Sequence, residues 1–259
     1  MVCESNLVLN SRGLCFSCSV LGKLSRLVSG RAPCLPLACA TNGGEGRKVG
    51  VVPTRYVEQQ LLQNGYRRIC GVDEVGRGPL AGPVVATAVI LPEHFIIEVK
   101  GDSKRYTEKQ RLRVYEAIMA APGVEHASCT VSARDIDRLN IGEATMYALA
   151  EAAKLVGADY ALIDGNQVPG TMTIPCHTIV KGDASESCIS VASIIAKVQR
   201  DRFMVDLDKR YPGYGFKSNK GYGSLEHRNA IMDLGPTPEH RRSFAPLSRM
   251  NLQGDDKTS

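Results

Sequence analysis

Gly71-Val72-Asp73-Glu74-Val75-Gly76-Arg77-Gly78 is the stretch on which the interpretation of this chain depends. It places two adjacent carboxylates at the end of an apolar strand. Burying such groups is costly unless a cation, an arginine or a shifted pKa compensates them, and a hard divalent metal ion meets that need. The glycines beside Arg77 allow bare backbone to approach a ligand, while the guanidinium can bind a phosphate. The stretch indicates a metal ion and a nucleic acid together; a solvated polar turn is the alternative.

Two further acids follow apolar runs in the same way. Asp164 ends the run 160–164 and precedes a glycine, and Asp183 ends the run 179–183. In open α/β sheets ligands bind beyond the carboxyl ends of the strands, so Asp73 and Asp164 would share one crevice if their strands are neighbours. Acids at three strand ends are difficult to explain by surface solvation alone.

These patterns give a set of four acids: Asp73, Glu74, Asp164 and Asp183. They would offer only oxygen ligands, which suits Mg²⁺ or Mn²⁺ and argues against zinc. Two such ions about 3.5–4 Å apart can clamp the attacking and leaving oxygens of a phosphodiester, so the predicted reaction is metal-assisted phosphoryl transfer to water. Successive strand residues point to opposite faces, so Asp73 and Glu74 cannot both face a metal from a regular strand. We expect a bulge or twist there, or a contribution from the backbone carbonyl of Glu74.

The alternation of apolar runs with helical spacing predicts an α/β chain. The first two strands are joined by a short turn, which implies antiparallel neighbours. Ser132 with Asp135 is a capping-box signature that starts a helical turn. The expected strands are residues 68–73, 83–91, 127–131 and 160–164, and the expected helices are residues 107–121, 141–156, 187–211 and 224–234.

The bulk composition does not by itself indicate nucleic-acid binding. Residues 1–50 hold six Lys/Arg and two Asp/Glu, so they carry four of the five net positive charges of the chain. Local clusters must therefore account for binding. No apolar run reaches the length of a membrane-spanning helix, and we expect no membrane association. Four cysteines beyond the first 50 residues lie among apolar residues and are predicted to be small core residues: Cys70, Cys129, Cys176 and Cys188.

The first 45 residues have the composition of an organellar transit peptide, rich in Ser, Arg, Leu and Cys and poor in acids. The small residues around Leu37-Ala38-Cys39-Ala40 favour a chloroplast, with a mitochondrion as the other possibility. The chain is thus divided into a leader or disordered segment at 1–45, a linker and possible short helix at 46–65, a catalytic core at 66–210, a substrate-contacting helical segment at 211–250 and a disordered tail at 251–259.

Over residues 66–250 the chain resembles a bacterial-type ribonuclease HII. Each matching motif is weak alone, but their common order along the chain is specific. Arg77 between its glycines is similar to this type, whereas the sister family HIII has lysine there. The matching segments are residues 71–85, 102–104, 162–166, 181–184, 196–202, 211–216, 220–223 and 240–246.

The resemblance implies a ribonuclease H-like mixed five-stranded sheet flanked by helices, with a helical C-terminal extension. It implies an endonuclease that hydrolyses the RNA strand of RNA/DNA hybrids and cuts 5′ of ribonucleotides embedded in duplex DNA, leaving 5′-phosphate and 3′-hydroxyl ends. Two Mg²⁺ or Mn²⁺ ions would be held by the four acids, and a monomer is expected. The implied substrate-binding residues are Gly76, Arg77 and Gly78 at the 2′-hydroxyl, Ser103 and Lys104 at a backbone phosphate, and Tyr222 at the RNA–DNA junction.

Several basic residues and the histidines are left with open or modest roles. Lys197, Arg200 and Arg202 would be ordinary exposed cations without the resemblance. Arg241 and Arg242 would contact the duplex or pair with acids, and His177, His227 and His240 fit no metal spacing and are interpreted as structural. Two alternative functions remain open at this point, a catalytically silent hybrid-binding module and another ribonuclease H-like nuclease such as a junction resolvase.

Overall fold

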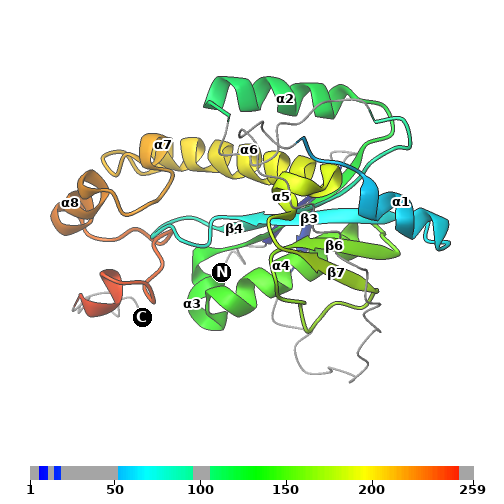
Figure 1. The fold of residues 1–259 in the computed structure, drawn as a ribbon. Coiled ribbons are helices and arrows are strands. Elements are labelled where there is room, and N and C mark those ends of the chain that lie inside the picture. Colours follow the sequence, from blue (N-terminus) through cyan, green and yellow to red (C-terminus); the bar gives the residue numbers. More distant parts are fainter. Residues whose placement is uncertain (1–5, 11–14, 19–51, 96–105, 251–259) are drawn as a thin grey trace, which may run out of the picture.

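The computed structural model of the chain shows one sheet covered by helices on both faces (Figure 1). The residues that it describes are 6–10, 15–18, 52–95 and 106–250. Within these segments, every helix is too short or too polar to span a membrane.

Five strands form the centre of the sheet. β3 (Ile69–Val75) lies antiparallel to β4 (Val84–Ile90), which lies antiparallel to β5 (Glu125–Val131). On the other side of β3, β6 (Tyr160–Asp164) is parallel to β3 and β7 (Cys176–Ile179) is parallel to β6. The predicted mixed five-stranded sheet is confirmed, as is the antiparallel pairing of its first two strands.

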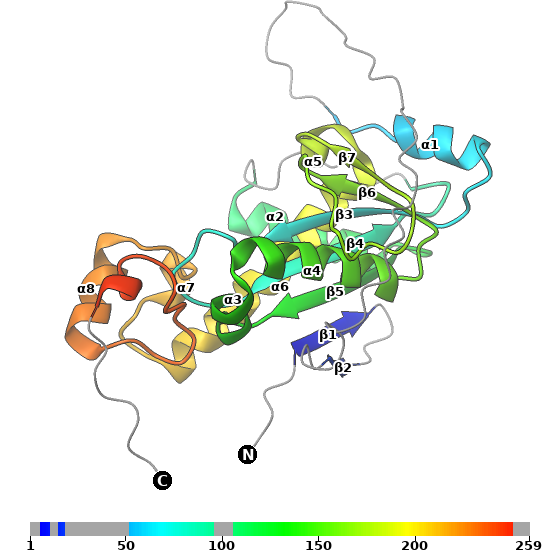
Figure 2. The ribbon, with the colours of Figure 1, turned by 90° about the horizontal axis from the view of Figure 1, so that it is seen from below.

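Two short strands from the N-terminal segment extend this sheet at the β5 edge (Figure 2). β1 (Asn6–Asn10) pairs with β5 and β2 (Cys15–Cys18) pairs with β1, so the full strand order is β2-β1-β5-β4-β3-β6-β7. The sequence pattern placed residues 1–45 outside the fold, and that expectation does not hold for these two strands. The physical reason is that an edge strand presents unpaired backbone N–H and C=O groups, which another extended segment can satisfy.

The helices form layers on the two faces of the sheet (Figure 1). α6 (Ser187–Arg210) packs directly on β3 and β4, and α2 (Glu108–Ala120) packs on α6. α4 (Ile141–Leu155) covers the opposite face, with α3 (Ala133–Leu139) packed against it. α1 (Tyr56–Gln63) precedes β3 and contacts it. These helices agree with the predicted ones to within a few residues at each end.

The contact between β3 and α6 requires a glycine. Cys70 and Val72 of β3 belong to the apolar cluster under α4, whereas Ile69 belongs to the cluster under α6. Gly71 therefore faces α6, and a Cβ there would lie 2.3 Å from the backbone carbonyl carbon of Cys188. Because Gly71 has no side chain, α6 can lie directly on the strand that carries Asp73.

Three helix starts are fixed by hydroxyl side chains. Thr107 begins α2 with a reciprocal capping box to Gln110, and the Ser132 hydroxyl accepts from the Asp135 N–H at the start of α3. Ser224 caps α8 (Leu225–Leu234) in the same way. These caps satisfy N–H groups that a helix leaves without partners in its first turn, and they confirm the capping signature predicted at Ser132.

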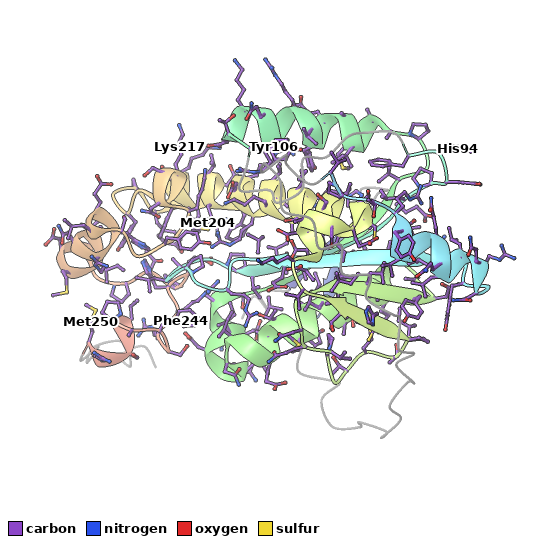
Figure 3. The ribbon with its side chains drawn as sticks, viewed as in Figure 1. His94, Tyr106, Met204, Lys217, Phe244 and Met250 are labelled. Atoms are coloured by element: carbon purple, nitrogen blue, oxygen red, sulfur yellow. The ribbon has the colours of Figure 1, made fainter. Side chains whose placement is uncertain are left out.

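The segment after α6 folds back as a small helical unit at one end of the molecule (Figure 1). It contains α7 (Phe216–Asn219), α8 and the 3₁₀-helix η3 (Leu247–Arg249). Leu80 and Ala81, from the connection between β3 and β4, share its apolar cluster with Met204 of α6 (Figure 3). The unit is therefore packed against the segment that follows the Gly76-Arg77-Gly78 turn.

Candidate active site

Asp73 and Asp164 are brought together by neighbouring parallel strands. Val72 of β3 is paired with Ile163 of β6, so Asp73 and Asp164 are the next residues on the two strands. Asp73 is buried, and its Oδ1 accepts a hydrogen bond of 2.7 Å from the N–H of Glu74. The condition on which the two acids were expected to share one crevice, that their strands are neighbours, is met.

Glu74 lies on β3 without the expected bulge. The pairing of β3 with β4 runs one to one through Asp73, Glu74 and Val75, so the strand is regular at this point. The expected bulge does not occur, because the pairing ends only after Val75, whereas the two alternatives, a twist or a contribution from the Glu74 backbone carbonyl, stay predictions. Glu74 thus starts from the opposite face to Asp73, and its Oε1 accepts from Nη1 of Arg77 at 3.4 Å.

Asp183 reaches the site by a different route from the one predicted. β7 ends at Ile179, and Asp183 belongs to the short helix α5 (Gly182–Ser185), so it does not end a strand. Lys181 turns the chain with a φ of 58° before that helix. The N–H of Asp183 donates to Oδ1 of Asp164 at 3.3 Å, which places Asp183 beside Asp164.

The carboxylates carry charge that their surroundings do not fully compensate. Burial raises the pKa of Asp73 well above its usual range, and repulsion from Glu74 and Asp164 adds to this shift. Burial also raises the pKa of Glu74, with Arg77 opposing the shift and Asp164 adding to it. Within the described part of the chain, no three acid, histidine or cysteine side chains form a ready-made metal site.

The Gly76-Arg77-Gly78 turn is hydrogen-bonded through its backbone carbonyls to a buried arginine. The Arg241 guanidinium donates to the carbonyl oxygens of Gly76, at 2.5 Å, and of Arg77, at 2.9 Å. It also donates to the carbonyl of Gly82, at 2.8 and 3.0 Å. Gly76 has a φ of 97°, and a Cβ there would lie 2.3 Å from Nε of Arg200. The turn therefore directs two of its carbonyls inward and requires glycine at its first position.

Tyr222 lies against this turn. The residue is 48% exposed, and a ring carbon lies 3.6 Å from the position of a Cβ built on Gly78. Gly221, the residue before it, accepts from the N–H groups of Leu80 and Ala81 at 2.8 and 3.3 Å. The exposed Tyr222 thus lies next to Gly78 of the turn. Arg77 of the same turn is hydrogen-bonded to Glu74, so the turn connects Tyr222 with the acids.

A family model described as ribonuclease HII matches residues 70–247. The chain belongs to the ribonuclease HII family. Ribonuclease HII of Ruegeria pomeroyi is 44% identical over 219 residues, covering 84% of this chain and 92% of that protein. The ribonuclease H2 structure from Pyrococcus horikoshii OT3 matches with a TM-score of 0.60 and 25% identity, over 71% of this chain and 96% of that one. The structure of Bst-RNase HIII in complex with Mn²⁺ matches in fold, with a TM-score of 0.56, 20% identity and coverage of 73% and 70%.

Membership of the ribonuclease HII family establishes the enzyme class, a ribonuclease H, which is a hydrolase. It also agrees with the resemblance drawn from the ordered motifs.

Two buried arginines of this ribonuclease HII were not predicted. Arg200 and Arg241 are fully buried, whereas the sequence suggested an exposed cation for the first and a duplex contact or acid partner for the second. Arg200 donates to the carbonyls of Pro83, Lys220 and Ala81 at 2.9, 3.0 and 3.2 Å. Burial lowers the pKa of Arg241 to about 9 and that of Arg200 to about 10, so both remain charged at neutral pH. The signal for Arg200 was its place four residues from the buried Ala196 and Met204 on one helix face.

The other cations are less central than the two buried arginines. Lys197 donates to Asp201 at 2.6 Å, and the guanidinium of Arg202 lies 4.8 Å from the ring centroid of Tyr115. The side chain of Arg242 is exposed. Ser103 and Lys104 lie outside the described residues, so their predicted phosphate contact stays a prediction.

The histidines take the structural positions expected of them. His227 and His240 are buried and hydrogen-bonded to each other, with 3.0 Å between their Nε2 atoms. His177 lies on β7, where it pairs with Leu162 of β6.

Proposed function

We propose that the chain is an endonuclease that hydrolyses the RNA strand of RNA/DNA hybrids and cuts 5′ of ribonucleotides embedded in duplex DNA. The products would carry 5′-phosphate and 3′-hydroxyl ends. One observation carries the proposal: Glu74 of the acid cluster is bonded to Arg77, the central residue of a glycine turn on which the Tyr222 ring lies. The acids proposed to bind the metal ions are thus in direct contact with the turn proposed to recognise the ribose.

The acids fit a pair of Mg²⁺ or Mn²⁺ ions. Asp73, Glu74, Asp164 and Asp183 offer only oxygen donors, and the raised pKa values of Asp73 and Glu74 reflect buried, mutually repelling charge that a cation would relieve. Such ions, when bound, supply activation of the attacking water and stabilisation of the leaving oxygen. The structural neighbour that holds Mn²⁺ supports this choice of metal.

The turn is suited to recognising a 2′-hydroxyl. The carbonyls of Gly76 and Arg77 are occupied by Arg241, and within the described residues the N–H groups of Arg77 and Gly78 donate to no protein acceptor. Because both residues are exposed, these N–H groups can meet an incoming ribose. The 2′-hydroxyl distinguishes RNA from DNA, and a site built to bond a hydroxyl rejects a ligand without it by as much as ~10⁴–10⁵.

Tyr222 and the surrounding positive groups would position the duplex. An exposed tyrosine ring can stack on a sugar or base, which contributes roughly 1–3 kcal/mol for a stacked base. Arg77 is half exposed and lies between the acids and solvent, where a guanidinium can bind a backbone phosphate. We expect Ser103 and Lys104 to add a further phosphate contact.

The test is cleavage of a labelled DNA duplex that contains one ribonucleotide, with Mg²⁺, with Mn²⁺ and with a chelator. The proposal predicts a single metal-dependent nick 5′ of the ribonucleotide and no cut in the matching all-DNA duplex. Asp73→Asn should abolish the nick, whereas Asp206→Asn, an exposed acid on α6, should leave it unchanged. Binding without cleavage by the wild type would favour the hybrid-binding module instead, and cutting of a four-way junction without ribonucleotides would favour a resolvase.

The leader remains part of the proposal. We infer from the composition of residues 1–45 that they direct the enzyme to an organelle, with the chloroplast favoured, and that the mature enzyme acts as a monomer. A fluorescent protein fused after residue 45 should enter plastids, and uniform cytosolic fluorescence would contradict this assignment.

A further inference from the structure

A chain of hydrogen bonds connects the C-terminal segment to the backbone of Tyr222. The N–H of Thr237 donates to Nδ1 of His240 at 2.9 Å. The Nε2 atoms of His240 and His227 lie 3.0 Å apart, and Nδ1 of His227 lies 2.8 Å from the carbonyl oxygen of Tyr222. All three links join buried or partly buried groups, so water does not replace them readily.

The direction of every bond in this chain follows from its two ends. A backbone N–H only donates, so Nδ1 of His240 must accept and its Nε2 carries the proton. A carbonyl oxygen only accepts, so Nδ1 of His227 carries a proton and its Nε2 accepts from His240. Both rings are therefore neutral and each is fixed as one tautomer. Burial agrees with this, since it lowers the pKa of His240 to about 4 and lowers that of His227.

The same short segment also reaches the glycine turn. His240 is followed directly by Arg241, whose guanidinium holds the carbonyls of Gly76 and Arg77. The N–H of Arg241 donates to the carbonyl of Leu80 at 2.8 Å, which fixes this residue to the connection between β3 and β4. His240 is thus linked through His227 to Tyr222, and the adjacent Arg241 binds the glycine turn.

We propose that His240, acting through His227, is a positioning residue that sets the place of Tyr222 relative to the Gly76-Arg77-Gly78 turn and so determines discrimination of a single ribonucleotide. This inference rests on the proposed function. It concerns the spacing between the two surfaces proposed to contact the ribonucleotide, so it affects substrates with one ribonucleotide most. A uniform RNA/DNA hybrid offers a 2′-hydroxyl at every position and tolerates a displaced tyrosine better.

The two histidines also belong to the packing of the helical unit, which the experiment must separate from positioning. Their rings lie 5.3 and 5.6 Å from the ring of Phe216. His227→Leu keeps an apolar contact with Phe216 but removes the donor to Tyr222. His227→Asn retains a nitrogen donor near the place of Nδ1. Asn229→Ala changes an exposed residue on the same helix and serves as the control.

The experiment measures kcat and KM for a duplex with one ribonucleotide and for a uniform hybrid, alongside the melting temperature of each variant. We expect His227→Leu to lose roughly tenfold in kcat/KM on the single ribonucleotide relative to the uniform hybrid. His227→Asn should recover most of this ratio, and Asn229→Ala should not change it. In a Tyr222→Ala background, His227→Leu should have no further effect on the ratio, because the two residues would act through one contact.

An unchanged ratio in folded His227→Leu, or an equal and independent loss in the Tyr222→Ala background, overturns the inference and leaves the proposed function standing. If His227→Leu does not fold, His240→Asn tests the same link, because its side chain can still accept from Thr237 but cannot reach His227. A wild type that fails to nick the single ribonucleotide overturns both the inference and the proposed function.

Discussion

The guanidinium of Arg241 holds the carbonyl oxygen of Gly76 from a position 165 residues later in the chain. The bond is buried, and the same guanidinium also binds the carbonyls of Arg77 and Gly82. The glycine turn beside the acids therefore depends on the C-terminal helical segment for its conformation. The surface that we propose to recognise the sugar thus depends on residues far apart in the sequence, the turn at 76–78 and Arg241.

Replacement of Arg241 should damage both stability and sugar discrimination. Arg241→Met leaves three backbone carbonyls without their donor, which predicts a loss on the order of 3 kcal/mol in the free energy of unfolding. Arg241→Lys keeps the charge but cannot fork between carbonyls, so we expect it to fold and to cut single ribonucleotides less selectively. Chemical denaturation and cleavage assays measure the two effects. Arg134→Met, at an exposed position on α3, should be near wild type in both.

Gly71 should tolerate no side chain. An added Cβ would lie 2.3 Å from the backbone of Cys188, so Gly71→Ala must push α6 away from β3. Overpacking of this kind costs about 1–3 kcal/mol, and here it also displaces the strand that carries Asp73. The melting temperature and activity of Gly71→Ala should both fall. Gly170→Ala, where nothing lies within 4 Å of the new Cβ, is the matched control, and an equal effect at the two positions would contradict the packing described here.

The neutral histidine pair predicts acid sensitivity of the helical unit. The pKa of His240 falls from its usual 6.5 to about 4 in the folded protein, so folding favours the neutral ring. Its contribution to stability is therefore full above pH 6.5 and is lost as the pH falls toward about 4. Melting temperatures measured across this range should fall less steeply for His240→Asn than for the wild type. Parallel curves for the two proteins would show that the pair does not titrate in this way.

Local patterns were sufficient to predict four central strands and most helices, and the resemblance supplied the mixed five-stranded sheet. Apolar runs bounded by glycine and proline marked the central strands, helical spacing marked the helix that begins after Thr107, and a capping signature marked the helix start at Ser132. Asp73 and Asp164 were expected to share one crevice if their strands are neighbours, and the parallel pairing of β3 with β6 meets that condition.

The errors arose where long-range packing decided the structure. Asp183 was assigned to a strand end because an apolar run precedes it, but Lys181 turns the chain into a short helix before it. Arg200 and Arg241 were taken for surface or duplex-binding cations because their partners are backbone carbonyls more than a hundred residues away in most cases. No local pattern identifies an acceptor that carries no side-chain signature.

The proposed hydrolysis requires that carboxylates from β3, β6 and α5 bind divalent cations together. Calorimetric titration of the intact protein with Mn²⁺ tests this directly, with Asp164→Asn as the variant and Asp206→Asn as the exposed control. We expect binding by the wild type and by Asp206→Asn, and affinity at least tenfold weaker for Asp164→Asn, because one shared oxygen ligand becomes a neutral amide. Equal Mn²⁺ affinity in all three proteins would contradict the claim that these acids form one metal centre.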